Sequence, residues 1–454
     1  MKEKKSQQFA SPRILALGFI AIIIIGTLLL TLPISSANKT VTSPIDACFT
    51  AVSASCVTGL TTLDTATHWS TFGHTVILIL IQIGGLGFMT MAVLISLIIK
   101  KAISPKEQML IAASYNLNSY IGIRPLVKRI VIGTLSIEAI GAVFLSFRFI
   151  SDFGVGQGIF KSIFHSVSAF CNAGFDILGV GNPAIKNSSY YLENPLVSLV
   201  FSALIILGGI GFLVWGDIIN LAGKKHRLLS VYSRFVIIIT LVLLIMGTAL
   251  FAIFEWNNPL TLGKISSPLN KLIASFFQST TWRTAGFAFM NNGNFTEGSQ
   301  LLGLILMFIG GASGSTAGGV KVATFGILVY SVWCVSTGKK HTKVFGRTIS
   351  GTSFARATAV IFVQLGMICL SALIINTCCD FALSDVIYEV VSAISTVGVT
   401  TGITPQLSSV AKVTVMCLMY FGRVGILTVT YAVMNNQSSA SESVSYPDAN
   451  MLIG

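Results

Sequence analysis

Long apolar stretches, separated by short polar segments, dominate the hydrophobic pattern of the chain. A helix needs about 20 apolar residues to cross the hydrocarbon core of a bilayer. Eight stretches approach or exceed that length, at 14–33, 76–99, 127–150, 196–221, 235–254, 301–332, 357–377 and 413–434. The pattern therefore predicts an all-α integral membrane protein with eight transmembrane helices.

Shorter apolar segments lie between the two long stretches of each successive pair, at 45–57, 159–172, 269–282 and 386–396. They are too short to cross a membrane, and such segments are typical of re-entrant helices or of buried core. Each leads into similar residues around one glycine: Cys56-Val57-Thr58-Gly59-Leu60, Cys171-Asn172-Ala173-Gly174-Phe175, Arg283-Thr284-Ala285-Gly286-Phe287 and Thr396-Val397-Gly398-Val399. A second glycine element follows in every case, at Gly84-Gly85, Gly208-Gly209, Gly310-Gly311 and Gly422.

This regularity indicates a fourfold internal repeat. Each repeat contains two spans, so all four have the same orientation, unlike the inverted repeats of many secondary transporters. We expect four parallel span–pore helix–filter loop–span repeats around a quasi-fourfold pore. The expected boundaries place the repeats at 14–100, 126–222, 234–333 and 356–434, the cytoplasmic loops at 101–125, 223–233 and 334–355, and cytoplasmic ends at 1–13 and 435–454.

The shared glycines favour a ring of backbone carbonyl oxygens, although a close helix contact would explain any one of them alone. Non-helical backbone at membrane depth survives only where it is buried or lines a water-filled cavity. Four such loops can replace the water shell of a cation, and the C-terminal ends of the short helices add negative potential. We therefore predict one main ion site, a filter formed by Val57, Thr58, Gly59, Asn172, Ala173, Gly174, Thr284, Ala285, Gly286, Thr396, Val397 and Gly398.

Charge predicts the orientation of the chain in the membrane. Only 10% of the residues are charged, whereas a soluble domain carries about a quarter. Most of the 29 Lys and Arg residues precede the first span or lie in the loops after the second, fourth and sixth spans. By the positive-inside rule, these segments and both termini are cytoplasmic. The net charge of +13 therefore reflects topology and not nucleic-acid binding.

Catalytic and metal-binding motifs are missing from the sequence. The eight cysteines show no paired spacing apart from the adjacent Cys378 and Cys379, and there is no CxxC, HExxH or GxSxG motif. This pattern predicts that the cysteines are small buried apolar residues and not a disulfide framework or a metal site. We predict that the chain is not an enzyme and has no catalytic residues.

The four glycine motifs resemble those of the TrkH/TrkG/KtrB superfamily of potassium uptake subunits, and the resemblance extends from about Ile14 to Met434. Eight spans without an additional N-terminal pair are closer to KtrB. The resemblance implies selective K⁺ uptake, often stimulated by Na⁺ in the KtrB branch. It also implies a homodimer on a cytoplasmic octameric ring of nucleotide-binding KtrA-type (TrkA-type) subunits. The chain has no nucleotide-binding fold of its own, so nucleotide control would come from that partner.

Small residues interrupt the sixth span at 310–319. Each glycine costs about 1 kcal/mol in a helix, so the pattern predicts a broken helix, with a small-residue helix contact as the alternative. The resemblance implies an intramembrane gating loop that Arg423 contacts from the eighth span. The predicted gate residues are Gly310, Gly311, Ser313, Gly314, Ser315, Thr316, Gly318, Gly319, Lys321 and Arg423.

Other charged and polar residues leave alternatives open. Glu138 lies in the third span without an identifiable partner, so a structural and a functional role are equally open. Asp64 and Asp176 either concentrate cations at the outer mouth or are solvated loop carboxylates. His165 is expected to be hydrogen-bonded core. The basic loops 100–129 and 337–356 suit either a cytoplasmic partner or anionic lipid.

A Na⁺- or H⁺-coupled secondary transporter is the alternative function. Glycine-broken spans would fit it, whereas parallel repeats with filter-like loops favour a pore.

Overall fold

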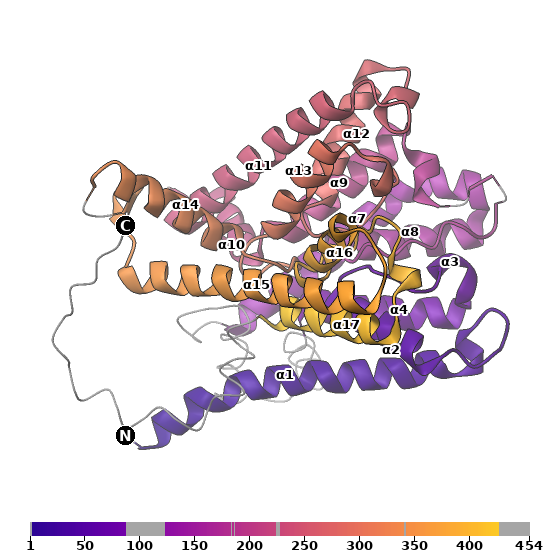
Figure 1. The fold of residues 1–454 in the computed structure, drawn as a ribbon, viewed down its shortest axis with the longest axis horizontal. Coiled ribbons are helices and arrows are strands. Elements are labelled where there is room, and N and C mark those ends of the chain that lie inside the picture. Colours follow the sequence, from indigo (N-terminus) through magenta and orange to yellow (C-terminus); the bar gives the residue numbers. More distant parts are fainter. Residues whose placement is uncertain are drawn as a thin grey trace.

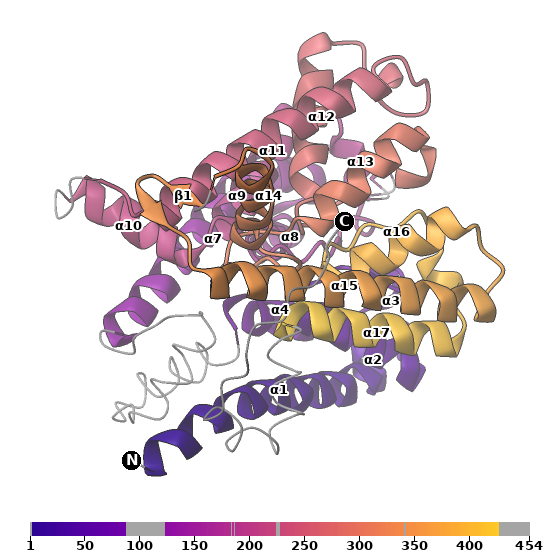
Figure 2. The ribbon, with the colours of Figure 1, turned by 60° about the vertical axis from the view of Figure 1, so that its left-hand side comes forward.

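The computed structural model describes residues 2–87, 123–182, 184–185, 187–223, 228–339 and 342–425, and this part of the chain is mostly helical (Figures 1 and 2). The first half contains α1 (Lys2–Thr31), α2 (Pro44–Cys56), α3 (Thr65–His68), α4 (Thr71–Leu86), α7 (Ile123–Phe153), α8 (Val155–Phe170), α9 (Pro195–Gly209) and α10 (Phe212–Ala222). The second half contains α11 (Val231–Glu255), α12 (Pro268–Thr281), α13 (Glu297–Phe308), α14 (Val322–Ser336), α15 (Gly351–Cys378), α16 (Leu383–Ile394) and α17 (Ser409–Val424). A short antiparallel hairpin lies between α14 and α15, and each of its strands, β1 (Lys343–Val344) and β2 (Arg347–Thr348), has two residues.

The helices form four sets of the same order, α1-α2-α4, α7-α8-α9, α11-α12-α13 and α15-α16-α17. In each set the first helix packs on the short second helix. The third helix also packs on the short helix of the next set, so that α4 contacts α8, α9 contacts α12, α13 contacts α16, and α17 contacts α2. The contacts therefore close into a ring.

Local sequence explains where the third helix of each set begins. Ser70, Asn194, Thr296 and Ser408 each precede such a helix, and each side chain accepts a hydrogen bond from a backbone N–H in the first turn. These residues are favourable N-caps because they satisfy donors that the helix itself leaves free.

Three helices of the described part are long and apolar enough to cross a membrane: Val127–Phe153, Val231–Glu255 and Gly351–Cys378. Shorter apolar helices occupy Ala16–Thr31, Thr71–Leu86, Glu297–Phe308 and Val322–Ser336. The predicted spans at 76–99 and 413–434 extend beyond residues 87 and 425, and those parts lie outside the described residues, as do the tail 435–454 and most of the loop 101–125.

The segment 196–221, expected as one continuous span, is instead two helices, α9 and α10, bent by 95°. Gly211 adopts a left-handed backbone (φ +96°) at the bend, and glycine reaches this conformation without steric penalty. The Phe212 N–H donates to the Gly314 carbonyl oxygen at 2.9 Å, so another repeat stabilises the bend. The predicted break of the sixth span is present between α13 and α14.

Burial separates the short helices from the long ones. The C-terminal parts of α2, α8, α12 and α16 are buried almost completely. The long helices instead expose large apolar side chains, including Leu28 (64%), Ile253 (70%) and Phe362 (70%). Contiguous apolar surface of this kind marks contact with other apolar matter, and it is expected on the lipid-facing side of a membrane protein. The short helices therefore lie inside a ring of longer helices that have apolar outer faces.

Candidate functional site

The four predicted glycines meet at the centre of the ring. A methyl group placed on Gly59 would lie 2.5 Å from the Ala173 carbonyl oxygen, and one on Gly174 would lie 2.8 Å from that of Ala285. Methyl groups on the other two glycines would also meet a carbonyl oxygen of the next loop. The order of these contacts is Gly59 to Ala173, Gly174 to Ala285, Gly286 to Val397, and Gly398 to Thr58. The four loops therefore form a closed cycle in which no side chain fits at a glycine.

The same unusual backbone occurs in all four loops. A non-glycine residue two positions before each glycine is left-handed, namely Val57 (φ 58°), Asn172 (60°), Thr284 (73°) and Thr396 (50°). Each such residue costs about 1–2 kcal/mol, and strain of this kind clusters at functional sites. The turn also ends each short helix one or two residues before the end of the predicted apolar segment. The twelve predicted filter residues thus lie together, and the side chains of the eight that are not glycine are 0–1% exposed.

Hydroxyl groups on the short helices hold these loops. The Ser53 Oγ accepts from the Gly59 N–H at 3.0 Å, and the Ser392 Oγ accepts from the Gly398 N–H at 3.1 Å. In the second repeat Ser168 Oγ accepts from the Phe175 N–H at 3.1 Å. One serine position therefore fixes the backbone in three of the four repeats.

The segment 309–321 connects α13 to α14, contains the predicted gating loop and contacts two other repeats, the second and the fourth. The Ala312 N–H donates to the Gly209 carbonyl oxygen at 2.9 Å, and Thr316 Oγ1 donates to that of Phe170 at 3.1 Å. Gly318 packs against Thr396. The loop is therefore adjacent to the ends of the glycine loops. All the predicted gate residues lie in it except Arg423: Gly310, Gly311, Ser313, Gly314, Ser315, Thr316, Gly318, Gly319 and Lys321.

Arg423 lies in the last turn of α17 and reaches the gating loop, as the family resemblance implies. Its guanidinium donates to the Thr316 carbonyl oxygen and to those of Gly84 and Gly85, the last at 3.0 Å. One side chain thus joins the first, third and fourth repeats. Lys321 Nζ donates within the loop, to the Ala317 carbonyl oxygen at 2.7 Å.

Glu138 has partners that the sequence did not reveal. Gln82 Nε2 donates to its carboxylate at 3.3 Å, and Cys171 Sγ lies 3.8 Å from the other carboxylate oxygen. These partners belong to α4 and to the second glycine loop, so only the folded chain brings them together.

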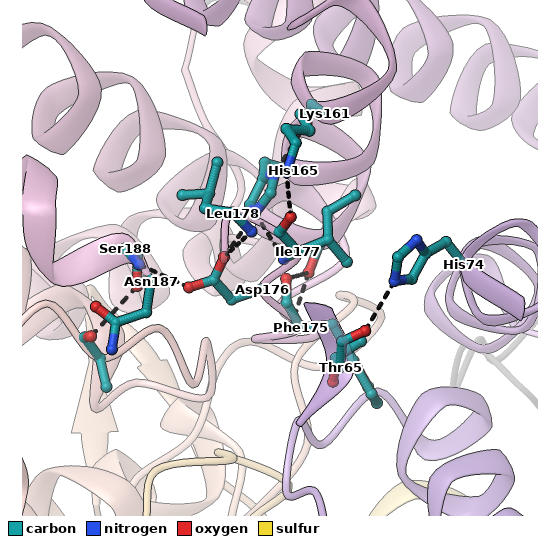
Figure 3. Close-up of polar contacts among 12 residues, drawn as sticks. Thr65, His74, Lys161, His165, Phe175, Asp176, Ile177, Leu178, Asn187 and Ser188 are labelled. Atoms are coloured by element: carbon teal, nitrogen blue, oxygen red, sulfur yellow. Dashed lines mark hydrogen bonds and ion pairs between the residues drawn. The ribbon is translucent and has the colours of Figure 1, made fainter. Parts of the chain in front are cut away.

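A buried polar network supports the second glycine loop. Figure 3 shows Lys161 and His165 of α8 directed toward the loop that carries Asp176. The His165 Nε2 lies 3.2 Å from Asp176 Oδ1, and the Ser188 N–H donates to Asp176 Oδ2 at 2.7 Å. Burial raises the pKa of the Asp176 carboxyl, but the hydrogen bonds from His165, Leu178 and Ser188 outweigh it and hold the pKa below its ordinary value.

The two carboxylates near the outer mouth therefore differ. Asp64 caps α3 by accepting from the Thr67 N–H at 2.8 Å, whereas Asp176 fixes the loop after Gly174. His165 is hydrogen-bonded core, as the sequence predicted. Within the described residues no group of His, Cys, Asp and Glu is placed to hold a metal ion.

Three further residues were missed by sequence reasoning. Glu389 is fully buried in α16 and accepts from the Thr400 hydroxyl at 2.7 Å. Lys412 pairs with Asp46 at 2.7 Å and links α17 to α2. Arg283 is 8% exposed immediately before the third glycine loop. The available signal was a charge within a short apolar segment for Glu389 and a charge directly after one for Arg283.

Comparison with known proteins agrees with the predicted family. The TrkH family model, described as a cation transport protein, matches residues 4–443. The potassium/sodium uptake protein NtpJ of Enterococcus hirae is 40% identical, with 100% of this chain and 99% of that protein covered. Ktr system potassium uptake protein B of Bacillus subtilis is also 40% identical, with 98% and 97% covered.

Among solved structures, the potassium transporter TrkH from Vibrio parahaemolyticus matches with a TM-score of 0.69. The match covers 92% of this chain and 84% of the TrkH chain at 19% identity, and it supports the fold. The family model and the two relatives extend over nearly the whole chain. This chain therefore belongs to the TrkH family of cation transport proteins.

Proposed function

We propose that the chain is the potassium-translocating subunit of a bacterial K⁺ uptake system, with the four glycine loops as its single main ion site. The observation that carries this proposal is the closed cycle of four loops with the same left-handed backbone. The names of the relatives at 40% identity supply the ion.

Backbone chemistry explains how such a site would select a cation. The side chains of the loops are buried, which leaves carbonyl oxygens to replace the water molecules around a dehydrating ion. Four short helices end at the loops, and the partial negative charge of a helix C-terminus favours a cation there. Strained loops held by serine hydroxyl groups keep the oxygens in place before the ion arrives.

The gating loop would close the pathway below this site. Its contacts with Phe170, Gly209 and Thr396, next to two of the glycine loops, support this role. Arg423 binds it and adds a positive charge that repels cations. Opening would require the loop to leave these carbonyl groups and Arg423 to exchange partners.

The finer architecture is part of the proposal. The four helix sets correspond to repeats 14–100, 126–222, 234–333 and 356–434, with eight spans, four pore helices and both termini on the cytoplasmic side of the cell membrane. The basic loops, including the β1–β2 hairpin, would then face the cytoplasm.

Partners follow from the names of the relatives. The Ktr system name supports assembly with a regulatory subunit, which we propose to be a KtrA-type nucleotide-binding ring beneath a homodimer of this chain. The potassium/sodium uptake protein NtpJ supports stimulation by Na⁺. This chain would itself bind neither nucleotide nor nucleic acid.

A Na⁺- or H⁺-coupled transporter is the second candidate. Two interruptions favour it, the 95° bend between α9 and α10 and the break between α13 and α14, because coupled transporters bind ions at broken helices.

Uptake of ⁸⁶Rb⁺ into proteoliposomes tests the proposal with Gly398→Ser and a matched control, Gly402→Ser. Both glycines have positive φ, but only a side chain at Gly398 would meet a neighbouring loop. For the unmodified chain we expect ⁸⁶Rb⁺ uptake that K⁺ inhibits by competition and Na⁺ does not. This uptake should be lost in Gly398→Ser and retained in Gly402→Ser. Equal competition by Na⁺, or full uptake by Gly398→Ser, would contradict the carbonyl ring and favour the coupled transporter.

A further inference from the structure

A buried arginine borders a crevice behind the third glycine loop. Arg283 is only 8% exposed. Among the residues that the structure describes, none forms a hydrogen bond or an ion pair with its side chain, and Nε is fully enclosed. The crevice beside it lies between α9, α11 and Gly311 of the gating loop and has room for about one water-sized group. A buried charge without a partner is strongly unfavourable, so the site is incomplete as the protein alone forms it.

The internal repeat shows what belongs in this place. In the second repeat, Ser166 Oγ donates to the Glu138 carbonyl oxygen at 2.6 Å; in the third, Ser279 Oγ donates to that of Leu244 at 3.1 Å. Relative to the shared glycine, Ser279 lies one position later than Ser166, but in space the two serines correspond, because Ser166 contacts Gly141 and Ser279 contacts Gly247. These glycines lie three residues after Glu138 and Leu244, so Leu244 occupies the place of Glu138. Arg283 likewise stands where the second glycine motif has Cys171.

Gln82, the third residue that surrounds the Glu138 carboxylate, also has an equivalent one repeat further on. Gln82 and Ile206 each lie two residues before the first glycine of the second glycine element. Gln82, Glu138 and Cys171 form one hydrogen-bonded group, and all three equivalents, Ile206, Leu244 and Arg283, line the crevice. In the third repeat the crevice therefore lies where the second repeat has the Glu138 carboxylate. Leu244 stands at that position, so the third repeat supplies no carboxylate to Arg283.

We propose that the crevice binds a small monovalent inorganic anion of halide size, which pairs with the Arg283 guanidinium. The walls favour an ion of this kind because Ile205, Ile206 and Leu244 are apolar. Besides Arg283, only the lining side chains of Thr240 and Thr280 carry donors, which are too few for a multiply charged group such as phosphate. The anion would neutralise a positive charge directly beside Thr284 and so raise the cation affinity of the ring. This last consequence rests on the proposed function; the binding of the anion does not.

The test measures thermal unfolding of the full-length protein in detergent at constant K⁺ concentration, with gluconate replaced stepwise by chloride or bromide. We expect the unfolding midpoint of the wild type to rise with halide concentration and to saturate, because a ligand that binds the folded state stabilises it. Arg283→Gln should lose this dependence. The exposed Arg148→Gln, whose side chain is 41% exposed, is the matched control and should keep it.

Leu244→Glu provides the decisive variant, since it supplies the carboxylate that Glu138 supplies in the second repeat. Its midpoint in gluconate should reach that of the halide-saturated wild type and should not respond to halide. A wild-type midpoint that is equal in gluconate, chloride and bromide would overturn the anion site, as would halide dependence that persists in Leu244→Glu or Arg283→Gln. Failure of K⁺ uptake would leave these midpoints unaffected, so the two proposals fail separately.

Discussion

Removal of one hydroxyl group from α16 should loosen the fourth glycine loop without touching the loop itself. The Ser392 Oγ accepts from the Gly398 N–H at 3.1 Å, and both residues are buried. In Ser392→Ala this N–H loses its acceptor, and an unsatisfied buried donor costs about 1–3 kcal/mol. Since a difference of about 1.4 kcal/mol is tenfold in an equilibrium constant, the preference of the ring for Rb⁺ over Na⁺ should fall about fivefold to a hundredfold.

The C-cap residue of the same helix, Ser395, supplies the control. The Ser395 Oγ is buried in the described structure without a hydrogen-bond partner, so Ser395→Ala removes a similar volume and no bond. We expect near-normal ⁸⁶Rb⁺ uptake and competition by Na⁺ for Ser395→Ala, at equal protein abundance in proteoliposomes. In the first repeat Ser53→Ala and Ser55→Ala form an equivalent pair. Equal losses in both members of a pair, or unchanged selectivity in Ser392→Ala, would refute the reasoning.

Three more changes test other contacts. Arg423→Gln removes the charge that binds the Thr316 carbonyl oxygen, so ⁸⁶Rb⁺ uptake should rise severalfold; unchanged kinetics at equal abundance would remove Arg423 from the gate. Folding lowers the pKa of the Asp176 carboxyl. The carboxylate therefore stabilises the folded state fully at pH values above its pKa in the unfolded chain, about 4. This stabilisation is lost as the pH falls through the lower pKa of the folded state. The unfolding midpoints of wild type and Asp176→Asn should therefore differ at pH 6 and converge in stronger acid; a difference independent of pH would contradict this. Lys412→Met breaks the partly buried pair with Asp46 and should lower the unfolding free energy by about 1 kcal/mol, with a double-mutant cycle against Asp46→Asn as the measurement.

The sequence predicted those features that leave a local signal. The short helices, the turns at Gly59 and its three equivalents, and the break after Phe308 all follow from apolar length and glycine position. The left-handed backbone of the non-glycine residues two positions before each glycine does not. The repeat made the convergence of the four loops predictable as well, because equivalent segments of a closed ring must face one centre.

Features that depend on distant partners could not be predicted. Gly211 follows the Gly208-Gly209 pair, whose counterparts in the first and fourth repeats predict no bend, and the contact that stabilises the bend comes from Gly314 in another repeat. Glu138 seemed isolated because Gln82 and Cys171 reach it only through packing. The partners of Arg423 were expected from resemblance alone, since a carbonyl group that accepts from a distant arginine has no sequence signature.

The cyclic contact of each glycine with the carbonyl group of the next loop has an evolutionary consequence. In a channel assembled from four identical chains, every substitution appears four times around the axis. Here one chain contributes all four quarters, so a substitution changes only one of them. The four glycines must stay, because each one lies against the carbonyl oxygen of the next loop. The gating loop of the third quarter and Arg423 of the fourth therefore each occur once around the axis. A single chain with four unequal quarters can thus carry an asymmetric control element within a nearly symmetric ring.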